Sequence, residues 1–151
     1  MKTPDIARYF VDDDATFTIA ATDLLGQYGD MRYALLYSKI FFPEFVEVDG
    51  SIFLKVDEDD KRAELFSVRR KTSTMPLAQS EASFNSEEVG YLFRRDHQIS
   101  SDAIEIKLAH IIADAWRDRL SRLYPSRTFS VSVLDPDESG SVYSVEFFEV
   151  R

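Results

Sequence analysis

Apolar residues recur at helical spacing most clearly between residues 102 and 125. The stripe consists of Ile104, Leu108, Ile111, Ile112, Ala115, Leu120 and Leu123. Asp102 and Glu105 have the spacing of a capping box, and Pro125 prevents the helix from continuing. The pattern therefore predicts a long amphipathic helix with one buried face.

Two shorter helical patterns lie nearer the start of the chain. Residues 17–28 place apolar side chains at helical spacing between an aspartate-rich start and Gly29. The β-branched residues within 16–19 leave a strand as the alternative for that part. Residues 31–42 predict a second helix, which Pro43 ends because the residue before a proline disfavours the α conformation.

Between residues 57 and 98, the secondary structure is predicted mainly from the charged and capping residues at the ends of each segment. Residues 57–71 begin with acidic and finish with basic side chains, an order that matches a helix dipole. Ser86 is expected to cap a short helix with Val89 and Leu92 facing inward. Residues 72–86 are small and polar without a period, and they predict a long loop.

Alternating apolar and polar positions predict two β-hairpins, 45–56 and 128–150. In the first, a three-residue loop with Gly50 at positive φ is expected, because a two-residue loop would place Glu47 beside the apolar Ile52. The expected buried face is Val46, Val48, Ile52, Leu54 and Val56. Phe45 and Phe53 would then share the opposite face.

These elements predict a single domain, residues 1–151, of the α+β class. About five helices would pack on an antiparallel sheet of about four strands. The two hairpins, 45–56 and 128–150, would join into that one sheet, because an isolated hairpin is marginally stable in water. The long helix is expected to cover the apolar face of the sheet.

Composition narrows the class of protein. The chain has 151 residues, 44% hydrophobic and 30% charged, which is typical of a globular fold. It contains no cysteine, which excludes disulfides and thiolate metal sites. No stretch approaches the roughly eighteen apolar residues that a membrane span needs, and the first residues lack a signal-peptide pattern. A cytoplasmic location is therefore expected.

The net charge is −9, and it is uneven along the chain. Residues 1–60 contain 13 acidic and 5 basic side chains. A negative field repels nucleic acid and anionic lipid and attracts basic proteins. The basic runs at 69–71 and 94–95 could contact nucleic acid if they converged, but the net charge opposes this interpretation.

No pattern assigns a catalytic, cofactor-binding or metal-ligating residue. The carboxylates of 12–14 and 57–60 could hold Mg²⁺ or Ca²⁺, but they lack EF-hand spacing and lie where helix starts are expected. His110 and Asp114 face the same way on the long helix, a spacing typical of a surface ion pair. We therefore expect no enzymatic activity and no cofactor.

The opening hairpin and the acidic residues that follow it are the predicted partner-binding surface. The predicted residues are Glu44, Phe45, Glu47, Asp49, Phe53, Asp57, Glu58, Asp59 and Asp60. Two aromatic anchors inside a charged rim are typical of a protein interface. The expected function is an immunity- or antitoxin-type protein that neutralises a basic partner. A homo-oligomerising accessory subunit and a metal-dependent enzyme with Asp/Glu ligands are the alternatives.

Overall fold

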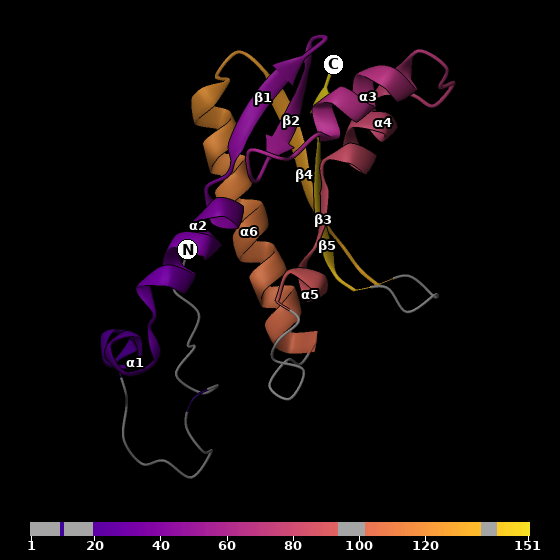
Figure 1. The fold of residues 1–151 in the computed structure, drawn as a ribbon. Helices are drawn as coiled ribbons and strands as arrows, with labels where there is room; N and C mark the ends of the chain where they lie inside the picture. Colours follow the sequence, from indigo (N-terminus) through magenta and orange to yellow (C-terminus); the bar gives the residue numbers. More distant parts are fainter. Residues whose placement is uncertain (1–9, 11–19, 94–101, 137–141) are drawn as a thin grey trace. The chain divides into compact units, whose positions relative to one another are not determined.

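The computed structural model describes residues 10, 20–93, 102–136 and 142–151. In chain order the elements are α1 (Ala21–Tyr28), α2 (Met31–Phe41), β1 (Glu44–Val48), β2 (Ser51–Lys55), α3 (Arg62–Arg70), α4 (Leu77–Phe84), β3 (Ser86–Glu88), α5 (Val89–Leu92), α6 (Asp102–Leu123), β4 (Thr128–Leu134) and β5 (Ser144–Val150) (Figure 1). The strands form two antiparallel sheets, β1-β2 and β3-β5-β4. The α+β class is confirmed, but the expectation that both hairpins join into one sheet is wrong.

The chain forms two compact units, residues 1–37 and 38–151. In the first, the rings of Phe10 and Tyr28 stack at 5.4 Å, and those of Tyr33 and Tyr37 stack at 6.1 Å. Asp30 accepts a hydrogen bond from the Arg32 amide at 2.8 Å, at the start of α2. The residues before Ala20 on which the first helix was predicted lie outside the described part of the chain.

The hairpin β1–β2 has a two-residue loop, so the predicted three-residue loop is wrong. Val48 pairs with Ser51, and Asp49 and Gly50 both have positive φ, 52° and 78°. Positive φ at both central positions is the type I′ turn that Asp-Gly favours. Glu47 does share a face with Ile52, but its side chain is 52% exposed and pairs with Arg127 at 3.1 Å. The two-residue loop therefore does not bury the Glu47 carboxylate.

Both faces of this hairpin are covered. Ile52 and Leu54 belong to the larger core, where Phe45 meets Phe147 of β5 edge-on at 5.5 Å. On the other face Phe53 is 0% exposed and packs against Phe66 of α3, with ring centroids 4.6 Å apart. The two phenylalanines thus lie on opposite faces, and the expectation that they form one exposed aromatic patch is wrong.

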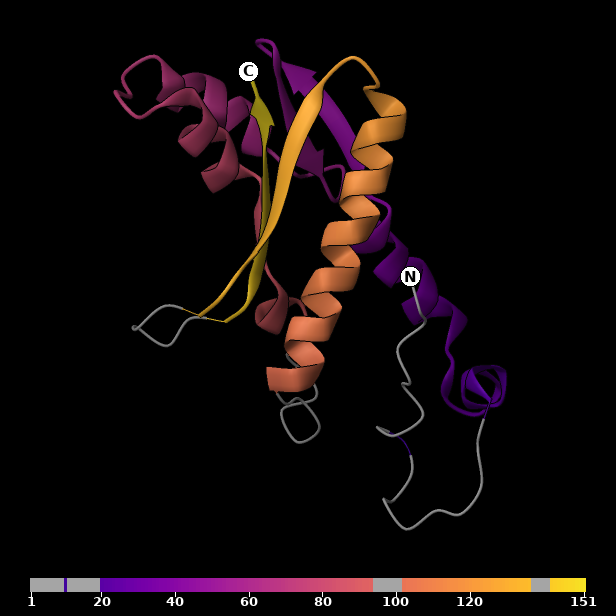
Figure 2. The same ribbon diagram turned by 180° about the vertical axis from the view of Figure 1, so that it is seen from behind.

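The second hairpin, β4–β5, is confirmed with its inner face buried. Val131, Val145 and Phe147 point into the core, and α6 lies along this face (Figure 2). The buried side of α6 is Ala109, Ile112, Ala113, Trp116 and Leu120. It is centred on Trp116, which the predicted stripe omitted and whose indole N–H donates to the Ile40 carbonyl at 2.7 Å. Leu123, predicted inward, is half exposed.

Helix α4 occupies the segment predicted as a loop. Its inward positions include Ser80 and Glu81, both buried, so no apolar period was visible in the sequence. The Glu81 carboxylate accepts hydrogen bonds from the Glu149 amide at 3.2 Å and from Arg151 at 2.9 Å. Ser86 begins β3 and pairs with Glu146, so it is not the predicted helix cap.

Asn85, between α4 and β3, binds the outer edge of the first hairpin. Its Oδ1 accepts from the Leu54 amide and its Nδ2 donates to the Ile52 carbonyl, both at 2.9 Å. The side chain is 0% exposed. It therefore satisfies, in place of a neighbouring strand, two backbone groups on the edge of β2 that would otherwise be buried without partners.

Substitution Asn85→Ala should lower the free energy of unfolding by about 3 kcal/mol, because the Leu54 N–H and the Ile52 C=O would both lose their partner. Urea denaturation measures this. Ser83→Ala on the exposed side of the same helix is the matched control and should change stability by less than about 0.5 kcal/mol. Equal stability of the Asn85 variant and the control would show that water replaces the amide.

Candidate functional site

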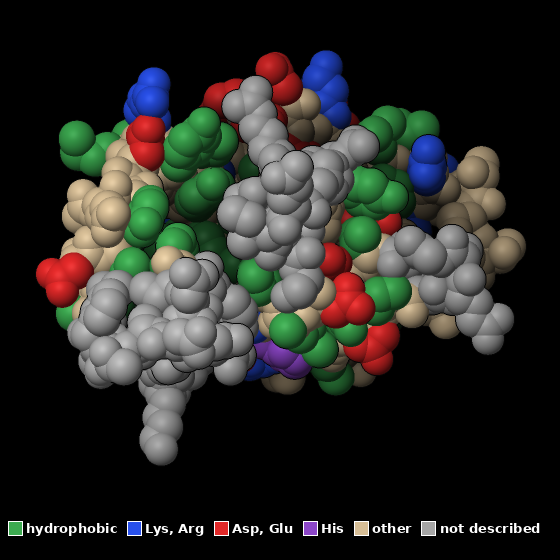
Figure 3. Space-filling model, turned by 90° about the horizontal axis from the view of Figure 1, so that it is seen from below, with side chains coloured by type: hydrophobic (Ala, Val, Ile, Leu, Met, Phe, Trp, Pro, Cys, Tyr) green, Lys and Arg blue, Asp and Glu red, His purple; other side chains and the backbone are tan. Residues whose placement is uncertain are grey.

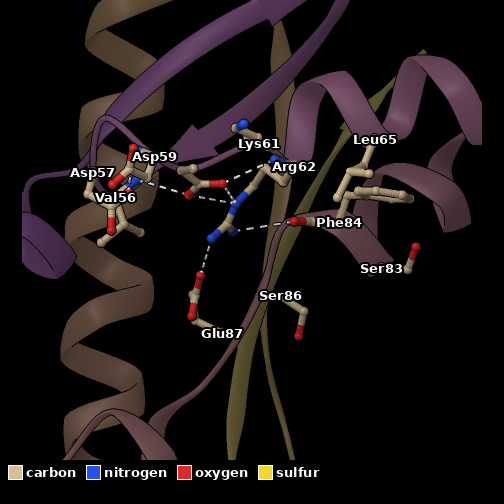
Figure 4. A pocket seen from close by; sticks show the side chains of 11 residues that line it. Val56, Asp57, Asp59, Lys61, Arg62, Leu65, Ser83, Phe84, Ser86 and Glu87 are labelled. Atoms are coloured by element: carbon tan, nitrogen blue, oxygen red, sulfur yellow. Dashed lines mark hydrogen bonds and ion pairs between the residues drawn. The ribbon is translucent and has the colours of Figure 1, made fainter.

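A groove opens between the 56–61 segment with the start of α3 and the end of α4 with β3 (Figure 4). Its volume is about 650 Å³. Val56, Asp57, Asp59, Asp60, Lys61, Arg62, Leu65, Ser83, Phe84, Ser86 and Glu87 line it. A second hollow of about 450 Å³ shares Ser83, Ser86 and Glu87 and adds Glu88, Tyr91, Leu92 and Ser144. The two hollows together are called the acidic groove below.

Arg62 stands at the centre of the groove and links its two walls. Its Nε donates to both Asp60 oxygens at 2.9 Å, and its Nη2 donates to Glu87 Oε1 at 2.5 Å. Its Nη1 donates to the Phe84 carbonyl at 3.3 Å. These largely buried side chains form a charge-assisted network, as the dashed lines of Figure 4 show. The guanidinium is therefore already engaged on both sides.

Asp60 also orders the start of α3. Burial raises the pKa of its carboxyl. Hydrogen bonds from the Arg62 side chain and from the Val56 and Arg62 amides lower the pKa by a larger amount, so it lies below the usual value. For Arg62, burial lowers the pKa, but the hydrogen bonds to Asp60 and Glu87 outweigh it and raise the pKa. Both shifts favour the charged forms of Asp60 and Arg62.

The rest of the groove has an acidic rim and one apolar wall. Within the described residues, Asp57, Asp59 and Glu88 have no salt bridge. Leu65, 52% exposed, forms the apolar wall with Phe84. Figure 3 shows apolar and acidic side chains side by side over the face seen from below, so their proximity alone does not mark a site. The groove is distinguished by its two walls, which the Arg62 network links.

The structure divides the predicted partner-binding residues into two groups. Asp57, Asp59 and Asp60 line the groove, and Glu58 beside them pairs with Lys55 at 3.0 Å. The hairpin residues lie elsewhere: Glu44 is exposed, Glu47 pairs with Arg127, and Asp49 accepts a hydrogen bond from Ser67. Phe53 is buried and Phe45 packs in the core, so Phe53 cannot meet a partner in this fold.

Sequence reasoning missed Glu87 and Glu88. Both belong to β3, a strand of three residues that was too short to leave an alternating pattern and was taken for the start of a helix. The adjacent pair of glutamates after a serine was the available signal. Only the fold shows that β3 is an edge strand facing the 56–61 segment.

The other candidate chemistries gain no support from geometry. Asp114 pairs with Arg117 at 2.6 Å instead of the exposed His110. In the part of the chain that the structure describes, no three His, Asp or Glu side chains are placed to hold a metal ion. None of the described helices is long and apolar enough to cross a membrane. The acidic run 12–14 and the basic pair 94–95 lie outside the described residues.

Substitution Asp60→Asn should destabilise the protein most at neutral pH. Because the folded pKa of Asp60 is lowered, its stabilising effect is present above the unfolded value of about 4 and is lost as the pH falls through the folded value. Urea denaturation from about pH 7 to about pH 2.5 should therefore show the gap between the wild type and the variant closing in acid.

The Arg62→Met background is the control for this titration. Without the guanidinium the Asp60→Asn gap should shrink at neutral pH and lose most of its dependence on pH. A gap of constant size across the whole pH range would instead mean that ionisation of Asp60 does not contribute to stability.

Comparison of the chain with family models, curated proteins and solved structures finds no match. Function is therefore inferred from the chain's own residues. The acidic groove, with its two walls and its unpaired rim carboxylates, is the feature of the described structure best suited to binding.

Proposed function

We propose that the protein is a non-catalytic interaction module that binds a basic protein partner through the acidic groove. One observation carries the proposal: the groove lining holds five carboxylates, Asp57, Asp59, Asp60, Glu87 and Glu88, but only two cations, Lys61 and Arg62. This excess of negative charge gathers in two adjoining open hollows, where it produces a local negative potential that attracts basic side chains.

The five carboxylates differ in whether they already form a salt bridge, and this determines which of them a partner could bind. Asp60 and Glu87 share the single cation Arg62, so they shape the groove and keep only part of their charge. Asp57, Asp59 and Glu88 supply the charge that a partner would meet. An Arg or Lys side chain approaching them would form new pairs without breaking existing ones, and the net charge of −9 would speed its arrival.

The apolar wall adds the second element of an interface. Leu65 and Phe84 offer carbon surface beside the charged rim, and burying such surface contributes roughly 25 cal/mol per Å² before the entropic costs of association. A partner segment with basic side chains and at least one apolar side chain would match both. Neutralisation of a basic toxin by an immunity- or antitoxin-type protein is the most concrete form of this proposal.

A fluorescent peptide of alternating lysine and valine is the probe for the proposed function. It should bind the wild-type protein, and its affinity should fall as salt is added, because exposed charges are screened. Fluorescence anisotropy across a salt series measures this. An affinity that does not change with salt, or an acidic peptide that binds as well, would contradict the proposal.

The triple variant Asp57→Asn, Asp59→Asn, Glu88→Gln should weaken this binding about tenfold, which corresponds to partly exposed pairs worth about 0.5 kcal/mol each. The triple variant Glu44→Gln, Glu47→Gln, Asp49→Asn changes the net charge equally on the hairpin and is the matched control. It should weaken binding less than about threefold. Equal losses would assign the effect to net charge rather than to the groove.

A further inference from the structure

The edge of β3 that faces away from β5 lies along the acidic groove. In the sheet order β3-β5-β4, β3 pairs on one side only. All three of its residues, Ser86, Glu87 and Glu88, line the groove. A short unpaired edge is normally covered or blocked, because it is a template for pairing with another chain. Here Arg62 reaches the Phe84 carbonyl before β3 and the Glu87 side chain, while an open hollow is lined by Ser86 and Glu88.

The hydrogen-bond pattern shows which backbone groups point into the groove. The Val89 amide donates to the Tyr143 carbonyl at 2.9 Å, so these two residues form a bonded pair. Bonded pairs alternate along an antiparallel ladder, which makes Glu87 with Val145 the next one. Ser86 and Glu88 occupy the intervening positions, and their N–H groups therefore point away from β5 and toward the groove.

These two N–H groups have no acceptor within the described part of the chain. The Ser86 carbonyl points the same way, so the edge offers a donor, an acceptor and a second donor in the order that a neighbouring strand requires. Glu88 has extended φ and ψ, −87° and 102°, and thus keeps the strand conformation up to the start of α5. The backbone is already in the geometry that pairing demands.

We propose that an extended basic segment of the partner adds to β3 as a fourth strand of the β3-β5-β4 sheet. This inference rests on the proposed function and names how the partner is held. Main-chain hydrogen bonds to Ser86 and Glu88 give such a complex its direction and register, while alternate side chains give its specificity.

Charge selects the occupant of this edge. A neighbouring strand lies about 4.8 Å from β3, so its side chains on one face come next to the Glu88 carboxylate. The 56–61 segment forms the opposite wall and carries Asp57 and Asp59. Both neighbours favour lysine or arginine. A second copy of this chain, with a net charge of −9, is electrostatically the poorer occupant.

Two variants at one position test the role of the backbone. Glu88→Ala removes the carboxylate and keeps the N–H, whereas Glu88→Pro removes both. Proline fits the φ of −87° and the helix start that follows, and the lost N–H is not used in the β3–β5 ladder. Urea denaturation should therefore give similar stabilities. The lysine–valine peptide should bind Glu88→Pro at least about tenfold more weakly than Glu88→Ala.

Peptides methylated on backbone nitrogen test the same contact from the partner's side. In an added strand the amides of alternate residues face β3, and the others face away. Methylation of one alternate set should reduce affinity at least about tenfold, and methylation of the other set should leave it nearly unchanged, although both peptides carry the same charge.

The outcomes separate the two proposals. If the parent peptide binds with salt dependence, but both methylated peptides bind equally and Glu88→Pro matches Glu88→Ala, strand addition is overturned and the proposed function stands. If the parent peptide does not bind at any salt concentration, both fail. Sedimentation that shows a dimer in wild type and a monomer in Glu88→Pro would make a second copy the occupant and overturn the basic segment.

Discussion

The side chain of Asn85 is the contact on which the arrangement of the two sheets depends. Its buried amide bonds two outward-facing backbone groups of β2, and the residue lies directly between α4 and β3. A side chain can satisfy two backbone groups but cannot extend the ladder further, so the hairpin β1–β2 stops there and the sheets remain separate. The edge of β3 that follows directly in the chain has no strand beside it in either sheet.

Arg62 then determines how much of the groove's charge remains available. It bonds Asp60 on one wall and Glu87 and the Phe84 carbonyl on the other, and so connects α3 to β3. Removing one partner of such a buried pair leaves an uncompensated charge, which costs more than the pair contributes when intact. The same network pairs two of the five groove carboxylates with one guanidinium and so halves their charge. Asp60 and Glu87 therefore shape the groove, and the other acidic residues supply most of its negative potential.

The sequence predicted the elements whose patterns are long and failed where polar residues occupy buried positions. The 22 residues of α6 and the serine-alternating hairpin β4–β5 were readable because each repeats its period several times. Helix α4 was not, since its buried face includes Glu81, which Arg151 neutralises from 70 residues away. Likewise the hairpin register turned on Glu47, whose partner Arg127 no local pattern could reveal. In the groove, the sequence predicted the acidic run 57–60 as a binding surface. It did not reveal that Asp60 pairs with Arg62 while Asp57 and Asp59 have no salt bridge.

Charge alone does not distinguish the two acidic surfaces of this chain; prior pairing does. Glu47 and Asp49 of the hairpin already have Arg127 and Ser67 as partners, so a basic ligand there would have to replace an existing contact. Asp59 and Glu88 have no side-chain partner among the described residues, and Asp57 accepts only the Asp59 amide at 3.0 Å, so a basic ligand would add a contact there. Charge pairs at a surface are weak and non-directional, whereas backbone groups at a strand edge are directional. In the proposed complex, the unpaired carboxylates would therefore attract many basic chains, and the strand edge would hold only those that reach it extended.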